Sequence, residues 1–164
     1  MVRHTNGYNR MKIFIMRHGE AETFANSDAE RALTSRGVNQ SVLVAKACAE
    51  QGEAEFSKVL VSPYLRAQQT WNAIKQYLTT SDQETSDDIT PYGKSDYVFE
   101  YICAAAQVQN LESVLLVSHL PLVGYLTAEF VSDMTPPMFP TSGLVCIDFD
   151  LEKRKGEMLW HIHP

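Results

Sequence analysis

The sequence predicts an α/β fold: a three-layer sandwich with a mainly parallel central sheet and an antiparallel C-terminal edge. Short apolar runs that suit buried strands alternate along the chain with longer stretches of helical periodicity. Strands and helices that alternate in this way form a parallel sheet with helices on both faces. The last two apolar runs are separated by a short charged turn at residues 152–156, which predicts an antiparallel hairpin.

The individual elements follow from the same patterns. Strands are expected at 12–16, 57–61, 113–117, 144–150 and 158–162, and helices at 35–51, 63–79, 95–108 and 121–131. Segment 80–92 is rich in Thr, Ser, Asp and Pro, which predicts a loop with one short strand near 85–89. Three prolines make 133–142 a second, rigid loop. Within it, Met138 and Phe139 either pack against a site or contact a partner, and packing is the preferred interpretation.

Length and composition indicate one globular domain. The 164 residues suffice for a single core, so we expect one domain over 11–164 and a disordered N-terminal extension at 1–10. A net charge of −6 and a pI near 5.3 argue against nucleic acid or an anionic membrane as the main partner. No apolar run resembles a signal peptide or a membrane span, so we expect a cytoplasmic protein, and a monomer.

The cysteines and the C-terminal histidines offer no metal site. Cys48, Cys103 and Cys146 lie far apart in apolar stretches without C-x-x-C spacing, so we expect buried free thiols. His161 and His163 share one face of the last strand, but no third ligand lies nearby in the sequence. An exposed terminal strand explains them better than a metal does, and no cofactor is expected.

The tripeptide Arg17-His18-Gly19 stands directly behind the apolar run 13–16. It therefore places a histidine and an arginine at the carboxyl end of a buried strand, where open α/β sheets bind their ligands. A histidine there can act as a nucleophile or a base, and the arginine can bind an anion.

Two further strands end in a similar way. The run 59–61 leads into Ser62 and, four residues later, Arg66, while 114–117 leads into Ser118 and His119. Because parallel strands end at the same edge of a sheet, Arg17, His18, Arg66 and His119 are expected to meet there. Ser62 and Ser118 are interpreted as turn or helix-start residues, since neither lies in a G-x-S-x-G sequence.

These motifs together resemble the histidine phosphatase superfamily, whose fold is like that of phosphoglycerate mutase. The resemblance rests on R-H-G at 17–19, on S-x-x-x-R-x-x-x-T at 62–70, on L-T-x-x-G at 33–37 and on the second histidine at 119. Residues 118–125 and 135–139 resemble, more narrowly, the small bacterial phosphohistidine phosphatases of that superfamily.

The resemblance implies the chemistry of the site. It implies that His18 attacks phosphorus and becomes a phosphohistidine that water then hydrolyses, with Arg17, Arg66 and His119 binding the phosphoryl group. The implied substrates are histidine-containing phosphotransfer domains of signalling phosphorelays.

Without a metal, Arg17, Arg66 and a protonated His119 would supply the positive charge that phosphoryl transfer needs. Arg31 is a further phosphate-binding candidate. The equal alternative is that Arg31 is a solvated arginine on a loop and does not bind phosphate. A neutral His18 is required for attack, and the neighbouring arginines should favour it. Pro121 should begin a helix whose N-terminal amides could face the anion.

One departure from the superfamily concerns the general acid. Larger members carry an acidic residue just before a Tyr-Gly-like segment, and Ile89 stands near that position here. Asp87, Asp88 and Asp96 remain candidates. Loss of the acid would favour a good leaving group such as the imidazole of phosphohistidine over the alkoxide of a phosphomonoester.

Two other functions stay open. A small phosphomonoesterase of the same superfamily would need a working acid among those three aspartates, whereas a non-catalytic module would only bind phosphohistidine. The stretches between the motifs are too short for a lid, and such an open site can admit a histidine on a protein surface. The sequence therefore favours a protein phosphohistidine phosphatase.

Overall fold

The computed structural model of the protein describes residues 10–164. Its main sheet has the strand order β5-β3-β6-β1-β7-β8. These strands are β1 (Arg10–Arg17), β3 (Lys58–Val61), β5 (Gln83–Thr85), β6 (Ser113–Ser118), β7 (Leu144–Asp150) and β8 (Lys155–Ile162). The first four run parallel, and β7 and β8 form the antiparallel edge. A separate two-stranded sheet pairs β2 (Glu55–Phe56) with β4 (Thr79–Thr80).

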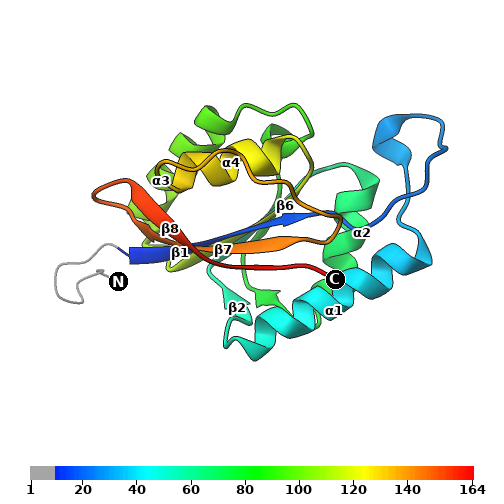
Figure 1. The fold of residues 1–164 in the computed structure, drawn as a ribbon, viewed down its shortest axis with the longest axis horizontal. Coiled ribbons are helices and arrows are strands. Elements are labelled where there is room, and N and C mark those ends of the chain that lie inside the picture. Colours follow the sequence, from blue (N-terminus) through cyan, green and yellow to red (C-terminus); the bar gives the residue numbers. More distant parts are fainter. Residues whose placement is uncertain (1–9) are drawn as a thin grey trace.

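Helices cover both faces of the main sheet (Figure 1). The α-helices are α1 (Ser35–Glu50), α2 (Leu65–Ile74), α3 (Ser95–Gln109) and α4 (Leu122–Phe130), and the 3-10 turns are η2 (Asp28–Glu30) and η3 (Asp87–Ile89). Figure 1 shows α3 and α4 on one side of the sheet and α1 and α2 on the other. The predicted three-layer α/β sandwich with a mainly parallel sheet and an antiparallel C-terminal edge is confirmed.

The two faces of β1 explain its unbroken apolar sequence. Ile13 and Ile15 pack into the cluster beneath α3 and α4, whereas Phe14 and Met16 pack into the cluster beneath α1 and α2. Side chains of a strand alternate between its two faces, so a strand covered on both faces needs apolar residues at every position. The motif Arg17-His18-Gly19 follows where this doubly buried strand ends.

Several elements differ from their predicted bounds. Helix α2 ends at Ile74, five residues before the predicted end, because the chain turns there to form β4 at 79–80. The short strand predicted near 85–89 lies at 83–85, where it pairs with β3, and 87–89 is a 3-10 turn. Strand β8 begins at Lys155 rather than 158, because it pairs with β7 along that strand's whole length.

The described chain begins inside the sheet. Arg10 is the first residue of β1 and forms an ion pair with Asp148, with 3.3 Å between Nη1 and Oδ2. The rest of the extension expected at 1–10 lies outside the described residues. Within residues 10–164 no helix has the length and apolarity required to cross a membrane.

The three cysteines are buried free thiols, as predicted. Burial raises the pKa of Cys48 and of Cys146 to about 12. Both therefore stay protonated at neutral pH and act as small apolar residues.

Candidate functional site

The predicted site residues meet at one edge of the sheet. In the parallel register Arg17 pairs with Ser118 of β6, so the segments that follow β1 and β6 start level with each other. Helix α2, which follows β3, directs Arg66 into the same place. The Arg66 Nε lies 3.2 Å from the His18 Nε2, and the ring centroids of His18 and His119 are 5.1 Å apart. Arg17, His18, Arg66 and His119 thus gather at one edge of the sheet, and the space between their side chains is called the pocket below.

The backbone of His18 is held on both sides. Its amide donates to the Ser118 carbonyl at 2.9 Å, and its carbonyl accepts from the Ser142 amide at 3.0 Å. The next amide, that of Gly19, donates at 3.0 Å to the hydroxyl of Thr70, which itself donates to the Arg66 carbonyl. Thr70 therefore couples the turn after β1 to the helix that carries Arg66.

Gly19 and Gly37 allow the turn after β1 to contact helix α1. A Cβ at Gly19 would lie 2.7 Å from the Gly37 carbonyl oxygen, and one at Gly37 would lie 2.1 Å from the Glu20 carbonyl oxygen. Both contacts are with backbone atoms, which cannot move aside as a side chain does. The glycines of the R-H-G and L-T-x-x-G motifs are therefore required by the same close approach.

The hydrogen bonds of His18 decide which ring nitrogen can react. Its Nδ1 lies 2.7 Å from the Gly19 carbonyl oxygen, which can only accept, so Nδ1 carries the proton. The lone pair is therefore on Nε2, where it accepts from the Arg66 Nε. Nε2 is thus the ring nitrogen with the lone pair, a choice that the sequence left open.

His18 is neutral at physiological pH. Burial, followed by the charges of Arg66, Arg17 and Arg31, lowers its pKa from 6.5 to about 4, against an opposing contribution from its bond to the Gly19 carbonyl. The sequence predicted a neutral imidazole because of the arginines alone. The structure adds the larger cause, since only 6% of His18 is exposed.

His119 is also neutral, which corrects the expectation that it carries positive charge. Burial first, then the proximity of His18 and Arg66, lowers its pKa to about 2. Its Nε2 lies 2.7 Å from the Ser62 Oγ, which also accepts from the Tyr64 amide at 3.3 Å. When the Ser62 hydroxyl donates to Nε2, the proton of His119 lies on Nδ1. Among residues 10–164 that buried Nδ1 has no partner.

Ser62 is therefore more than the turn residue that its sequence context indicated. Its fully buried hydroxyl contacts a site histidine directly. Tyr64, another residue that the sequence did not single out, packs its ring edge-on against His119 at 5.0 Å. The Arg66 Cζ lies 5.1 Å from the centre of the Tyr64 ring. Ser62 and Tyr64 both lie inside the S-x-x-x-R motif at 62–66, and this motif was the sequence signal that could have identified them.

Arg17 and Arg66 receive different supports. The Arg17 Nη1 donates to the Phe139 carbonyl at 2.8 Å, while its buried Nε has no partner among the described residues. The Arg66 Nη1 donates to the Asp28 carbonyl at 2.6 Å, and its Nη2 donates to the Asp28 Oδ2 at 3.1 Å. Burial, then Arg66 and Arg31, lowers the pKa of Arg17, but a guanidinium starts so high that it stays charged.

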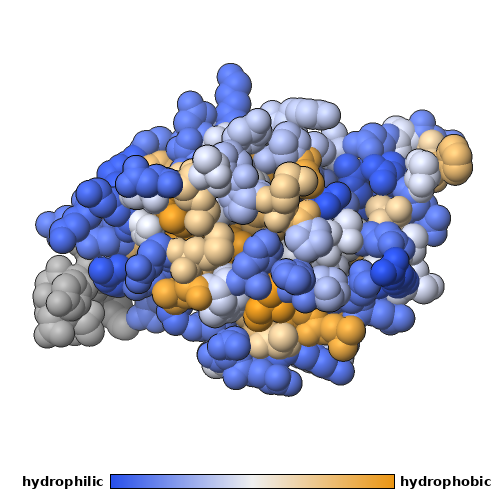
Figure 2. Space-filling model, viewed as in Figure 1, coloured by the Kyte–Doolittle hydropathy of each residue, from blue (hydrophilic) through white to orange (hydrophobic). Residues whose placement is uncertain are grey.

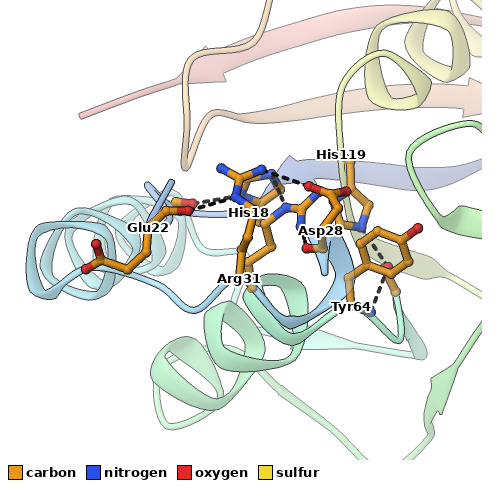
Figure 3. Close-up of polar contacts among 9 residues, drawn as sticks. His18, Glu22, Asp28, Arg31, Tyr64 and His119 are labelled. Carbon is orange, nitrogen blue, oxygen red and sulfur yellow. Dashed lines mark hydrogen bonds and ion pairs between the residues drawn. The ribbon is translucent and has the colours of Figure 1, made fainter. Parts of the chain in front are cut away.

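Arg31 lies beside Asp28 at the site (Figure 3). Its Nε donates to the Glu22 carbonyl at 2.7 Å, and its Nη1 lies 3.0 Å from the Asp28 Oδ1. Within the described chain no hydrogen bond joins it to His18, yet its charge contributes to lowering the pKa of His18. Arg31 is thus neither a direct partner of His18 nor a remote surface arginine.

The candidate acids do not contact the histidines. Ile89 is fully buried in the apolar core, and its carbonyl accepts from the Ser118 hydroxyl at 2.7 Å. Asp87, Asp88 and Asp96 are exposed, and in the described part of the chain none hydrogen-bonds to His18 or His119. The carboxylate that does contact site residues belongs to Asp28, which the sequence analysis did not identify.

The start of α4 fixes the backbone of His119. Pro121 immediately precedes the helix, which begins at Leu122, and the Val123 amide donates to the His119 carbonyl at 2.9 Å. The helix start therefore uses at least this amide to hold the histidine rather than to face an anion.

The C-terminal histidines do not form a metal centre with other residues. The rings of His161 and His163 are 5.7 Å apart, and the His161 ring lies 5.1 Å from that of Phe139. Over residues 10–164 no group of three or more His, Cys, Asp or Glu is placed to hold a metal ion.

Comparison with known proteins assigns the family. Over 155 residues the chain is 42% identical to the "Phosphohistidine phosphatase SixA" of Escherichia coli, covering 94% of both sequences. The chain belongs to the histidine phosphatase superfamily. A family profile described as "Histidine phosphatase superfamily (branch 1)" matches residues 13–90. This match includes the R-H-G, L-T-x-x-G and S-x-x-x-R-x-x-x-T motifs of the superfamily.

Two further relatives cover the same domain of this superfamily. The "Phosphohistidine phosphatase SixA homolog" of Haemophilus influenzae is 37% identical over 158 residues, covering 92% of this chain and 94% of that protein. A solved structure of the protein histidine phosphatase SixA complexed with tungstate superposes with a TM-score of 0.88 at 42% identity. The superposition covers 94% of this chain and 97% of that one.

Proposed function

We propose that the protein is a phosphohistidine phosphatase that works through a covalent phosphohistidine at His18, without a metal or other cofactor. The observation that carries the proposal is the hydrogen bonding of His18. Its Nδ1 is fixed as a donor to the Gly19 carbonyl, and its Nε2 lone pair faces the Arg66 Nε. A neutral, oriented imidazole next to a guanidinium is suited to attack phosphorus and then to hold the phosphoryl group.

The proposed reaction has two displacements. In the first, the Nε2 lone pair of His18 forms a bond to phosphorus while the P–N bond of the substrate breaks, and the leaving imidazole takes a proton from solvent. In the second, water attacks the phosphohistidine, its proton goes to solvent or to the departing phosphate, and His18 recovers its lone pair. Both steps require positive donors around the phosphoryl oxygens.

The unpaired donors of the pocket fit that requirement. The Nε of Arg17 and the Nδ1 of His119 are buried without partners among the described residues. Leaving a buried donor unsatisfied costs about 1–3 kcal/mol. A phosphoryl group bonded to the His18 Nε2 would offer three acceptor oxygens to Arg17, Arg66 and His119, which relieves that cost in the phosphorylated enzyme.

The absence of a nearby acid supports a substrate with a good leaving group. The side chains of Asp87, Asp88 and Asp96 are exposed, and the residue near the acid position, Ile89, packs in the core. An alkoxide leaving group needs a positioned proton donor, whereas an imidazole can be protonated by solvent before it leaves. A phosphohistidine is therefore favoured over a phosphomonoester.

Exposed apolar side chains on loops that contact the site residues support a protein as the substrate. Phe24, Tyr92 and Met138 are 91%, 87% and 78% exposed. Each lies on a loop anchored at the site, through Arg66–Asp28, Ser118–Ile89 and Arg17–Phe139 contacts respectively. Figure 2 shows apolar surface at the end of the molecule where Figure 1 places the loop of residues 20–34. We propose that a phosphotransfer domain bearing phosphohistidine docks on these loops.

The test compares three substrates with the wild-type protein: a phosphorylated phosphotransfer domain, p-nitrophenyl phosphate and a sugar phosphate. We expect the phosphorylated domain to be hydrolysed with the highest kcat/KM.

Phe24→Ala and Met138→Ala should raise KM for the domain but leave hydrolysis of free phosphohistidine unchanged. Val108→Ala is the matched control, because Val108 is 82% exposed at the opposite end of α3 from the site. Faster turnover of the sugar phosphate would favour the phosphomonoesterase instead, and binding without turnover would favour the non-catalytic module.

The proposal includes a cytoplasmic location and a monomeric state. Three buried free thiols suit a reducing compartment. A monomer leaves the loops around the pocket free for a protein substrate, and light scattering of the purified protein would measure the state directly.

A further inference from the structure

The carboxylate of Asp28 joins two arginines of the site. Its Oδ2 accepts from the Arg66 Nη2 at 3.1 Å, and its Oδ1 lies 3.0 Å from the Arg31 Nη1. The Asp28 carbonyl oxygen also accepts from the Arg66 Nη1 at 2.6 Å. One residue therefore binds both terminal nitrogens of Arg66 and a terminal nitrogen of Arg31, and Figure 3 shows its side chain beside that of Arg31.

These contacts determine which edge of Arg66 faces the nucleophile. A guanidinium is planar and has donors along more than one edge. Asp28 takes the edge formed by Nη1 and Nη2, and the Nε remains directed at the His18 Nε2 at 3.2 Å. If the far edge were not held, the guanidinium could rotate and turn its terminal nitrogens toward the pocket.

The backbone of Asp28 is positioned by its loop. The loop is closed by a bridge between Ala21 and Leu33 and by a 2.7 Å bond from the Glu22 amide to the Ala32 carbonyl. Asp28 begins the 3-10 turn η2, and its carbonyl also accepts from the Arg31 amide at 3.3 Å. The fixed backbone of Asp28 therefore sets where its carboxylate meets Arg31 and Arg66.

The charges of the pocket also require a carboxylate. Arg17, Arg31 and Arg66 bring three positive charges together, and the pKa of Arg17 is lowered in part by the other two. Hydrogen bonds from Arg31 and Arg66 lower the pKa of Asp28, so it stays ionised and cannot serve as a general acid. One negative charge leaves the group with a net charge of about +2, which matches a phosphoryl dianion.

We propose that Asp28 is a positioning residue for phosphoryl transfer, holding the Nη edge of Arg66 and tying Arg31 to it so that the Arg66 Nε meets the phosphoryl group on His18. The inference rests on the proposed function. It assigns a role to a loop residue that touches neither the nucleophile nor, in this arrangement, the transferred group.

The experiment combines Asp28 and Arg66 substitutions in a double-mutant cycle. kcat and KM are measured with a small phosphoramidate, and affinity is measured with tungstate, for the wild type, Asp28→Ala, Arg66→Ala and the double variant. Asp28→Ala should lower kcat and weaken tungstate binding by about tenfold to a hundredfold, as expected for an outer partner that orients a ligand-binding group. In the Arg66→Ala background the same substitution should change little, because its effect acts through Arg66.

Two variants separate positioning from folding. Asp28→Asn keeps one acceptor for the Arg66 Nη2 but loses the charge, so its kcat should lie between those of the wild type and Asp28→Ala. Glu30→Gln removes a carboxylate from the same turn, where Glu30 bonds to Ser27 rather than to an arginine, and should match the wild type. Melting temperatures show whether each variant is folded.

Three outcomes would overturn the proposal. Tighter tungstate binding by Asp28→Ala with an unchanged kcat would mean that Asp28 competes with the phosphoryl group. An equal loss in the presence and absence of Arg66 would mean a merely structural role, and no loss at all would mean no role. If the wild type fails to hydrolyse any phosphohistidine, the proposed function fails. The tungstate affinities of the four proteins in the double-mutant cycle would still decide whether Asp28 positions Arg66.

Discussion

The Ser62 Oγ lies 2.7 Å from the Nε2 of His119, and both side chains are buried. The serine that follows β3 therefore fixes the ring of the histidine that follows β6. Because the hydroxyl also accepts from the Tyr64 amide, its proton is available to Nε2. When that hydroxyl donates to Nε2, the proton of His119 lies on Nδ1, which has no partner among residues 10–164.

Ser62→Ala should therefore lower kcat/KM by about tenfold, the equivalent of about 1.4 kcal/mol for a lost hydrogen bond that orients a donor. The ring of His119 would remain, but its tautomer would no longer be fixed. Steady-state kinetics with a phosphoramidate measure the effect, and the exposed Ser132→Ala is the control. Unchanged kinetics would show that the tautomer of His119 does not depend on Ser62.

His18→Ala should abolish turnover and leave the fold intact, because the backbone bonds of residue 18 do not need its side chain. Rapid quenching of the wild type with a radiolabelled substrate should trap one phosphate that is acid-labile and alkali-stable. The alanine variant should trap none, and circular dichroism should match that of the wild type. Full activity in this variant would exclude His18 as the nucleophile.

Activity should persist in excess EDTA, since the positive charge of the pocket comes from Arg17, Arg31 and Arg66. The measurement is the turnover of a phosphoramidate before and after chelation and dialysis. Loss of activity that Mg²⁺ or Zn²⁺ restores would show that the charges have been assigned wrongly, and the pair His161 and His163 would then become metal-ligand candidates.

Hydrolysis should depend steeply on the leaving group, because among residues 10–164 no carboxylate hydrogen-bonds to His18 or His119. A phosphoramidate should be cleaved far faster than an alkyl phosphate. Changing Asp87, Asp88 or Asp96 to Asn should slow the phosphoramidate by less than about tenfold, below the usual contribution of a positioned general acid. Arg66→Ala should cost on the order of 2.7–4 kcal/mol in activation free energy, like the loss of an oxyanion-hole donor. If Asp88→Asn is as damaging as Arg66→Ala, the phosphomonoesterase becomes the better assignment.

Stability should fall as the pH drops below 6.5, the ordinary pKa of histidine. His18 and His119 have folded pKa values of about 4 and about 2, so between pH 6.5 and 4 the unfolded chain binds protons that the folded protein does not. Each histidine should therefore cost about 1.4 kcal/mol of unfolding free energy per pH unit across that window. Urea denaturation between pH 7.5 and 5 measures the slope. His119→Gln should flatten it. An equal slope in the wild type and His119→Gln would contradict a neutral, buried His119.

Much of the fold was predictable because its signals are local. The unbroken apolar run at 13–16 predicts a strand that is buried on both faces. Alternating polarity on either side of a charged turn predicts the hairpin of β7 and β8. The predicted end of α2 and the predicted start of β8 were wrong. Helix α2 ends where the chain turns into β4, which pairs with β2, and β8 starts where it pairs with the end of β7, so both bounds depend on strand pairing rather than on the apolar pattern of the segment itself.

The sequence by itself determined that Arg17, His18, Arg66 and His119 would reach one edge of a parallel sheet, because strand ends and motif spacing are properties of the chain alone. Only the tertiary structure decided which nitrogen of His18 is free, that His119 is neutral, and that Ser62 and Asp28 hold the site residues. Proton positions and pKa values depend on burial and on partners brought from distant segments. Asp28 reaches Arg66 across 38 positions of the chain, a contact that no local pattern encodes.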